Sequence, residues 1–284
     1  MSAVETREIP FHGGTIWMSI HGAHHTAPPL LCVPGGPGLP HDYLGPLAAL
    51  AAERPVILYD PIGTGRSTRS ALRWSRALLV EELAAVRDQL GTAPIDLYLH
   101  SAAILVADDL WSRPELYRRV ILASTPFDIP ELTAAIQARI DRLPPKLAAA
   151  LRAGEADPAK RRTTFYGQAY YEFSAANIMR LPSTPPPMQR AALGFNRDIL
   201  HAVKGGMLLH SAECVQWSIV DRLHQLTMPV LVSCGRHDPY EPDRVDKVTA
   251  SLPDRQLAVF EASAHMPHLE ETAAHLEVVA RFLR

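Results

Sequence analysis

The sequence has few cysteines, almost no net charge and no long apolar run. Its three cysteines, Cys32, Cys214 and Cys234, stand far apart in 284 residues. An odd, dispersed set of this kind indicates free thiols in a reducing compartment and not a disulfide framework. The formal net charge of −2 provides no basic surface for nucleic acid or for an anionic membrane.

No apolar stretch approaches the ~20 residues that cross a bilayer. The first residues, MSAVETREIPFHGG, also lack the basic start and apolar centre of a secretory signal. We therefore expect a cytoplasmic protein that binds neither membranes nor nucleic acid. The sequence leaves its oligomeric state open.

The chain contains 47% apolar and 20% charged residues, a composition typical of a globular protein. Short apolar runs alternate along it with amphipathic segments. The apolar runs predict buried strands at Leu30–Val33, Val56–Tyr59, Ile95–Leu99, Val120–Ala123, Val230–Ser233 and Leu257–Phe260. The amphipathic segments predict helices at Leu78–Leu90, Ala102–Trp111, Asp243–Leu252 and Thr272–Leu283. We therefore expect an α/β fold whose mostly parallel sheet has helices on both faces. Thr6–Pro10 and Thr15–His21 predict an antiparallel hairpin at the sheet edge.

The strand rhythm stops between residues 127 and 213. This stretch has an Ala-rich helical pattern, broken by Pro144-Pro145 and Pro185-Pro186-Pro187. The alternation resumes at Met228-Pro229, so the helical stretch interrupts one domain instead of following it. We predict a core formed by residues 1–126 and 214–284, with residues 127–213 inserted as a helical cap.

The first chemical signal is a serine that lies directly between a strand and a helix. Leu97-Tyr98-Leu99-His100-Ser101-Ala102-Ala103 has the position of a nucleophile elbow, a sharp turn that exposes the serine hydroxyl at the carboxyl end of the sheet. The usual spelling is G-x-S-x-G, and here Leu99 and Ala103 replace the glycines. Taken alone, the motif is equally consistent with a plain helix N-cap.

An acid and a base lie just after the last two predicted strands. The carboxyl ends of parallel strands meet at one edge of a sheet, so we expect Asp238 and His265 to lie near Ser101. His265 can then take the serine proton while Asp238 orients the imidazole. Asp238 could instead cap the following helix. His268 is a rival base, but His265 lies nearer the strand end.

A glycine-rich loop, Pro34-Gly35-Gly36-Pro37-Gly38, follows the first parallel strand. Backbone N–H groups in such a loop can bind the oxygen of a substrate carbonyl. We predict an oxyanion hole formed by the N–H groups of Gly36 and Ala102. The alternative is a tight turn without a catalytic role.

These motifs resemble those of the proline iminopeptidase branch of the α/β-hydrolases. Three further segments share the resemblance: Tyr59-Asp60-Pro61-Ile62-Gly63-Thr64-Gly65-Arg66-Ser67, Gly235-Arg236-His237-Asp238 and His265-Met266-Pro267-His268-Leu269-Glu270. The resemblance covers nearly the whole chain, and the order Ser, Asp, His agrees with that fold. It implies an α/β-hydrolase fold with a helical cap. It also implies that Ser101 is the nucleophile, Asp238 and His265 its partners, and Gly36 and Ala102 the oxyanion donors.

The chain departs from this family where the family binds the free α-amine of its substrate. The family uses two glutamates there, and the corresponding positions are Met207 and Pro239. A buried ammonium without a carboxylate partner is costly, so an aminopeptidase would need a replacement. The candidate replacements are Glu241, Glu213 and Glu172.

We expect a serine hydrolase that cleaves an amide or ester bond of a small-molecule substrate through an acyl-enzyme. The missing glutamates and the apolar, Tyr-rich segment Phe165–Phe173 favour a less polar ester or amide. The residues expected to contact the substrate are Met207, Tyr166, Tyr170 and Glu241. No organic cofactor or metal is expected, because the pair His24-His25 has no third ligand near it. Two alternatives stay open: an acyltransferase or another enzyme of specialised metabolism, and a non-catalytic ligand-binding protein on the same fold.

Overall fold

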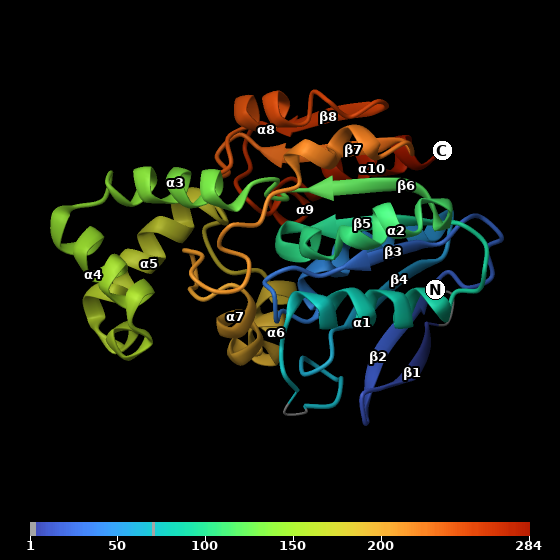
Figure 1. The fold of residues 1–284 in the computed structure, drawn as a ribbon, viewed down its shortest axis with the longest axis horizontal. Coiled ribbons are helices and arrows are strands. Elements are labelled where there is room, and N and C mark those ends of the chain that lie inside the picture. The colour runs from blue at the N-terminus through green and yellow to red at the C-terminus, as the bar shows by residue number, and fades with distance from the viewer. Residues whose placement is uncertain (1–3, 70–71) are drawn as a thin grey trace.

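The protein folds around an eight-stranded sheet with the strand order β1-β2-β4-β3-β5-β6-β7-β8 (Figure 1). The computed structural model describes residues 4–69 and 72–284. The strands are β1 (Glu5–Phe11), β2 (Gly14–His21), β3 (Leu30–Val33), β4 (Val56–Asp60), β5 (Ile95–His100), β6 (Tyr117–Ala123), β7 (Val230–Gly235) and β8 (Arg255–Phe260). Strand β2 pairs antiparallel with β1 and β4, and the other pairs are parallel. The mostly parallel sheet predicted from the sequence is confirmed.

The predicted edge hairpin is present between β1 and β2. Phe11 pairs with Gly14 across a two-residue turn. His12 and Gly13 have φ values of 43° and 77° in this turn. Two successive positive φ angles give a turn whose twist matches that of the flanking strands, which explains why glycine stands at the second position.

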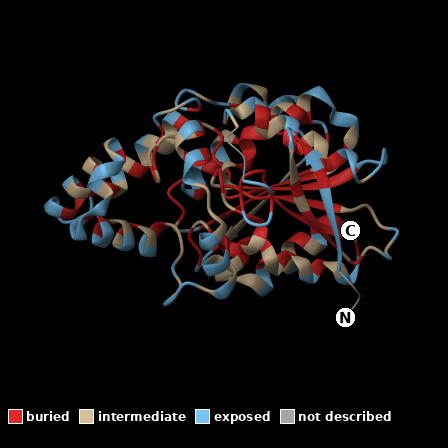
Figure 2. Ribbon diagram, turned by 90° about the horizontal axis from the view of Figure 1, so that it is seen from below, coloured by how far each residue is buried: buried red, intermediate tan, exposed pale blue. Residues whose placement is uncertain are grey.

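Helices cover both faces of the sheet, because successive side chains of each strand point to opposite sides. In β3, Leu31 and Val33 pack into one apolar cluster, and Leu30 and Cys32 into the other. The first cluster contains α1 (Arg76–Asp88), α2 (Asp108–Ser112), η5 (Val220–Gln225) and α8 (Pro242–Val248), and the second η1 (His41–Ala52) and α10 (Thr272–Leu283). Figure 2 shows the central strands buried between helices whose outer faces are exposed.

Three predicted helices have different bounds in the structure. Helix α1 spans Arg76–Asp88 instead of Leu78–Leu90. The segment Ala102–Trp111 is not one helix: η2 (Ser101–Val106) is a 3-10 helix, followed by the short α2 and by η3 (Pro114–Leu116). The β-branched residues Ile104 and Val106 lower the helix propensity of this stretch. Helix α8 ends at Val248 instead of Leu252.

The segment between β6 and β7 is helical. It contains α3 (Ile129–Ile140), α4 (Pro145–Ala156), η4 (Pro158–Arg162), α5 (Thr164–Asn177), α6 (Pro186–Gly194) and α7 (Arg197–Val203). Pro145 and Pro186 each occupy the first helical position, where a missing N–H costs nothing. Figure 1 shows these helices beyond the carboxyl ends of the strands. We propose that residues 127–213 form a cap over a core of residues 1–126 and 214–284.

Glycines allow the end of α6 to lie against two core loops. The N–H of Asn196 donates to the Gly38 carbonyl over 2.9 Å, and the N–H of Gly65 donates to the Gly194 carbonyl over 3.1 Å. The Asn196 amide also donates to the Gly63 carbonyl over 3.0 Å. A Cβ on Gly38, whose φ is +99°, would clash with the Asn196 carbonyl. We call these five residues the glycine contact.

The three cysteines are buried free thiols, as the sequence predicted. Burial raises the pKa of the Cys234 thiol to about 12. Very little reactive thiolate is therefore present at neutral pH, and the cysteines act as small apolar side chains.

Candidate active site

Ser101 is held in a left-handed conformation at the end of β5. Its φ is 55°, a strained value for a residue with a side chain. The loop after β3 lies directly against it, since a Cβ on Gly35 would lie 3.0 Å from the Ser101 Cβ and 3.2 Å from the Ala102 nitrogen. Leu99, which replaces the usual glycine of the elbow, is fully buried in the apolar core. The turn therefore forms without glycine at that position.

The structure brings Ser101, His265 and Asp238 into one hydrogen-bonded line. Nε2 of His265 lies 2.8 Å from Oγ of Ser101, and Nδ1 of His265 lies 2.7 Å from Oδ2 of Asp238. Asp238 is buried, and its other oxygen accepts the N–H of Tyr240 over 2.9 Å. Because Nδ1–H donates to the carboxylate, Nε2 is left free to accept the serine proton.

Arg139 of α3 fixes the loop that carries the acid. Its guanidinium donates to the carbonyls of Asp238 (2.8 Å) and His237 (3.2 Å) and to Oδ1 of Asn177 (2.6 Å). It also pairs with Glu241 over 3.1 Å, and the Glu241 side chain is 55% exposed. Glu241 therefore lies on the outer side of this loop, which corrects the prediction that it contacts the substrate.

Glu270 and the segment after α5 fix the loop that carries the base. The Glu270 carboxylate accepts the N–H groups of Ala264 (3.1 Å) and Met266 (2.9 Å), one on each side of His265. The N–H of His265 itself donates to the Ile178 carbonyl over 3.0 Å. The imidazole is thus positioned from both the core and the helical segment.

A chain of polar contacts joins the glycine-rich loop, the elbow and the base loop. Nε2 of His100 lies 3.2 Å from the His265 carbonyl, which can only accept, so this nitrogen carries the proton. Nδ1 of His100 then accepts from the Tyr43 hydroxyl over 3.0 Å, and the Tyr43 oxygen accepts the N–H of Gly35 over 2.7 Å. Burial lowers the pKa of His100 well below its usual value, which keeps the ring neutral. No sequence motif indicates this role, although His100 directly precedes Ser101.

His268, the rival base, is buried behind the site instead of facing it. Its ring packs against Tyr43 and His100, with centroid separations of 5.5 and 4.7 Å. Among the described residues, neither ring nitrogen of His268 has a hydrogen-bond partner. Burial lowers its pKa well below the usual value, and burial lowers that of His275 beside it to about 3.

Replacing His268 with leucine should make the protein more resistant to acid. The ring stays neutral in the folded state and is protonated in the unfolded state below about pH 6.5, so wild-type stability falls as the pH decreases. Leucine cannot be protonated, so the variant does not lose stability in this way as the pH falls. Leucine also removes the buried ring nitrogens that have no hydrogen-bond partner. We expect the variant to be at least as stable as wild type near pH 7.5 and about 2 kcal/mol more stable near pH 5, measured by urea unfolding. The matched change at exposed His24 should leave the pH dependence unaltered, and an identical pH dependence in wild type and His268→Leu would contradict the argument.

A cavity of about 320 Å³ opens above Ser101. Gly36 and Ala102, the predicted oxyanion donors, line it together with Ser101. Much of the remaining lining is apolar and comes from the helical segment, including Leu132, Ile136, Ile178, Met188, Phe195 and Leu200. The cavity therefore suits a substrate with an apolar acyl group.

Only some of the residues predicted to contact the substrate line the cavity. Met207, Tyr170 and Pro239 line the cavity. Tyr166 does not, because it is buried in the interior of the helical segment and its hydroxyl donates to Glu155 over 3.1 Å. Its predicted contact with the substrate is therefore corrected.

The glutamates considered as replacements for the missing pair lie outside the cavity. Glu213 accepts the N–H of Arg76 over 2.9 Å, and Glu172 accepts from the Gln168 amide over 2.9 Å on an exposed face of α5. Within residues 4–69 and 72–284, Asp238 is the one carboxylate that lines the cavity. It already orients His265, so a substrate ammonium would find no counter-ion there.

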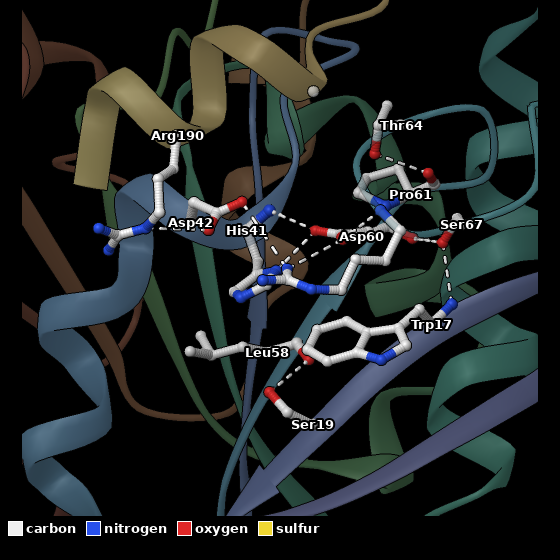
Figure 3. Close-up of polar contacts among 12 residues, drawn as sticks. Trp17, Ser19, His41, Asp42, Leu58, Asp60, Pro61, Thr64, Ser67 and Arg190 are labelled. Carbon is white, nitrogen blue, oxygen red and sulfur yellow. Dashed lines mark hydrogen bonds and ion pairs between the residues drawn. The ribbon is translucent and has the colours of Figure 1, made fainter. Parts of the chain in front are cut away.

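One group of side chains has the proximity of a metal site: His41, Asp42 and Asp60 (Figure 3). Nδ1 of His41 lies 2.6 Å from Asp60, whose second oxygen accepts the N–H of Arg66 over 2.8 Å. Burial alone would raise the pKa of Asp60, but these hydrogen bonds hold it below its usual value. The guanidinium of Arg66 lies 3.5 Å from Asp60, and that of Arg190 lies 3.4 Å from Asp42. Arginines thus supply the positive charge that a cation would bring, and the group joins the start of η1 to the loop after β4.

Residues 30–281 match the Alpha/beta hydrolase family, and the chain belongs to this family. It is similar to the proline iminopeptidase of Heyndrickxia coagulans, with 29% identity over 90% of each chain. The crystal structure of the Mycobacterium smegmatis proline iminopeptidase has a TM-score of 0.86 and 28% identity, over 98% of this chain and 97% of that one. The crystal structure of VinJ has a TM-score of 0.90 and 28% identity, over 98% of both chains.

These findings confirm the resemblance and the fold predicted from the motifs, and they identify the protein as a hydrolase. In the described part of the chain, no helix combines the length and apolar character needed to cross a membrane.

Proposed function

We propose that the protein is a serine hydrolase that cleaves an ester or amide of a small molecule through an acyl-enzyme. The observation that carries the proposal is the line of hydrogen bonds from Ser101 through His265 to Asp238 at the floor of an apolar cavity. No metal or organic cofactor has a part in this reaction.

In this mechanism Oγ of Ser101 attacks the substrate carbonyl carbon while Nε2 of His265 takes the hydroxyl proton. The N–H groups of Gly36 and Ala102 stabilise the oxyanion of the tetrahedral intermediate. The imidazolium, stabilised by Asp238, gives its proton to the leaving oxygen or nitrogen. Water then attacks the acyl-serine, and the same histidine accepts a proton from it.

The substrate we propose has an apolar acyl group and no free α-amine. The relatives named proline iminopeptidase support cleavage of a small amide. Met207 and Pro239, which stand where that family has glutamates, line the cavity here. The proposal therefore keeps the reaction of these relatives and changes the group that the cavity accepts.

A fluorophosphonate probe tests the proposed nucleophile. It should attach to Ser101 in the folded wild-type protein, because His265 activates that hydroxyl, and the adduct should be found by mass spectrometry of the peptide. Ser101→Ala and heat-denatured wild type are the controls and should stay unlabelled. A folded wild-type protein that stays inert would favour a ligand-binding protein on the same fold.

Adding an alcohol or amine during ester turnover separates hydrolysis from acyl transfer, since only an acyltransferase would form mainly the new ester or amide.

A further inference from the structure

The cavity contains a cation for which the proposed reaction has no use. Lys204 follows α7 and lines the cavity, and its ammonium donates to the Met207 carbonyl over 2.9 Å. An ammonium has three N–H donors, so this contact leaves two. In the part of the chain that the structure describes, no carboxylate oxygen pairs with Lys204 within 4.0 Å.

Glu155 is an acid whose charge acts on Lys204, and both of its carboxylate oxygens already accept hydrogen bonds. One oxygen accepts the N–H groups of Leu208 (2.7 Å) and Leu209 (2.9 Å), and the other accepts the Tyr166 hydroxyl over 3.1 Å. Burial lowers the pKa of Lys204, and the charge of Glu155 opposes that shift. Glu155 does not line the cavity, but its negative charge favours the protonated form of Lys204 without an ion pair between the two side chains.

The other titratable groups at this end of the cavity add no negative charge. Burial, and then the charge of Lys204, lowers the pKa of His210 to about 2, so this ring is neutral. Arg197 lines the cavity at an exposed position, with its guanidinium 5.9 Å from the centre of the Phe195 ring. Apart from Asp238, the charges that line the cavity are therefore positive.

We propose that Lys204 binds a carboxylate at the end of the substrate's acyl group that lies away from the bond to be cleaved. The site would thus take half-esters or half-amides of apolar dicarboxylic acids. Hydrogen bonds between an ammonium and a carboxylate are strong in an apolar, poorly hydrated site. Arg197 at the exposed position would also attract anions toward the cavity. The inference rests on the proposed function for the cleaved bond, but it concerns a separate contact.

The test compares 4-nitrophenyl half-esters of dicarboxylic acids with 4-nitrophenyl esters of the monocarboxylic acids of the same length, over a series of lengths. Wild type should prefer the carboxylate substrate at the length that reaches Lys204. In Lys204→Met the ratio of the two kcat/KM values should fall ~30-fold or more, because the substrate carboxylate loses its partner. Lys204→Gln, with its uncharged polar group, repeats the test if the methionine variant does not fold. Lys146→Met, at an exposed position of α4, is the matched control and should leave the ratio unchanged.

Reversing the charge at position 204 gives a second test of the proposal. In Lys204→Glu the preference should move toward esters that end in an amine. A wild type that hydrolyses the neutral esters through Ser101 but shows no carboxylate preference at any length would overturn the Lys204 proposal and leave the proposed function standing. Should no ester be hydrolysed, calorimetric titration compares the binding of hexanoate to Ser101→Ala with its binding to Ser101→Ala/Lys204→Met. Binding that is ~10-fold weaker in the double variant supports the proposal, and equal binding overturns it.

Discussion

Replacement of Ser101 with alanine should lower kcat by about 10⁴-fold or more and leave the fold intact. Alanine removes the attacking oxygen, and the N–H groups and cavity that remain can supply only the residual rate. The side chain of Ser101 bonds to His265 and supports no other described element, so the melting temperature should change little. The measurement is ester hydrolysis beside thermal unfolding of the same preparation.

A double variant sharpens this test. Residues that act as one unit are not additive, so Ser101→Ala/His265→Ala should be about as slow as Ser101→Ala alone. If Ser101→Ala kept more than about a tenth of the wild-type activity, the acyl-enzyme mechanism would be wrong.

Substrates with a free α-amine should be about a hundredfold poorer than neutral substrates of the same shape. Asp238 is the one carboxylate among the described residues that line the cavity, and it is bonded to His265. Lys204 would also repel an ammonium. A buried charge that lacks its partner costs about 3–5 kcal/mol, which at about 1.4 kcal/mol per decade is a factor of a hundred or more in kcat/KM.

The comparison is between a prolyl arylamide, its N-acetylated form and an acyl ester of similar size. Pro239→Glu places an acid at a position where the family resemblance implies a glutamate, and it should move the preference toward the free amine. A wild-type preference of more than about tenfold for the free amine would contradict the argument. Another acid, such as Glu241, would then have to reach the cavity.

Most of the sheet could be predicted from sequence, because strands buried on both faces appear as continuous apolar runs. The proximity of Ser101, Asp238 and His265 could be predicted for a related reason: each follows such a run, and parallel strands bring their carboxyl ends together. The helix predicted at Ala102–Trp111 was wrong, because its amphipathic pattern did not reveal the 3-10 turn that leaves the elbow.

The supporting contacts could not be predicted in this way. Arg139, Tyr43 and Glu155 act on residues far away in the chain, and periodicity carries no information about such pairs. For Glu241 and Tyr166, the position in the sequence predicts a contact with the substrate. The structure shows instead that an ion pair and a buried hydroxyl direct these side chains away from the cavity.

The glycine contact has a consequence for protein engineering. Gly38 belongs to the same loop as Gly36, and Asn196 bonds to it directly. The helical segment is thus a structural support of the loop that we propose stabilises the oxyanion. Deleting the segment to admit bulky compounds would release that loop, so a trimmed protein should be a slower catalyst and not a more permissive one. A transplanted cap would need to carry residues 194–196 and meet small residues at positions 38 and 65.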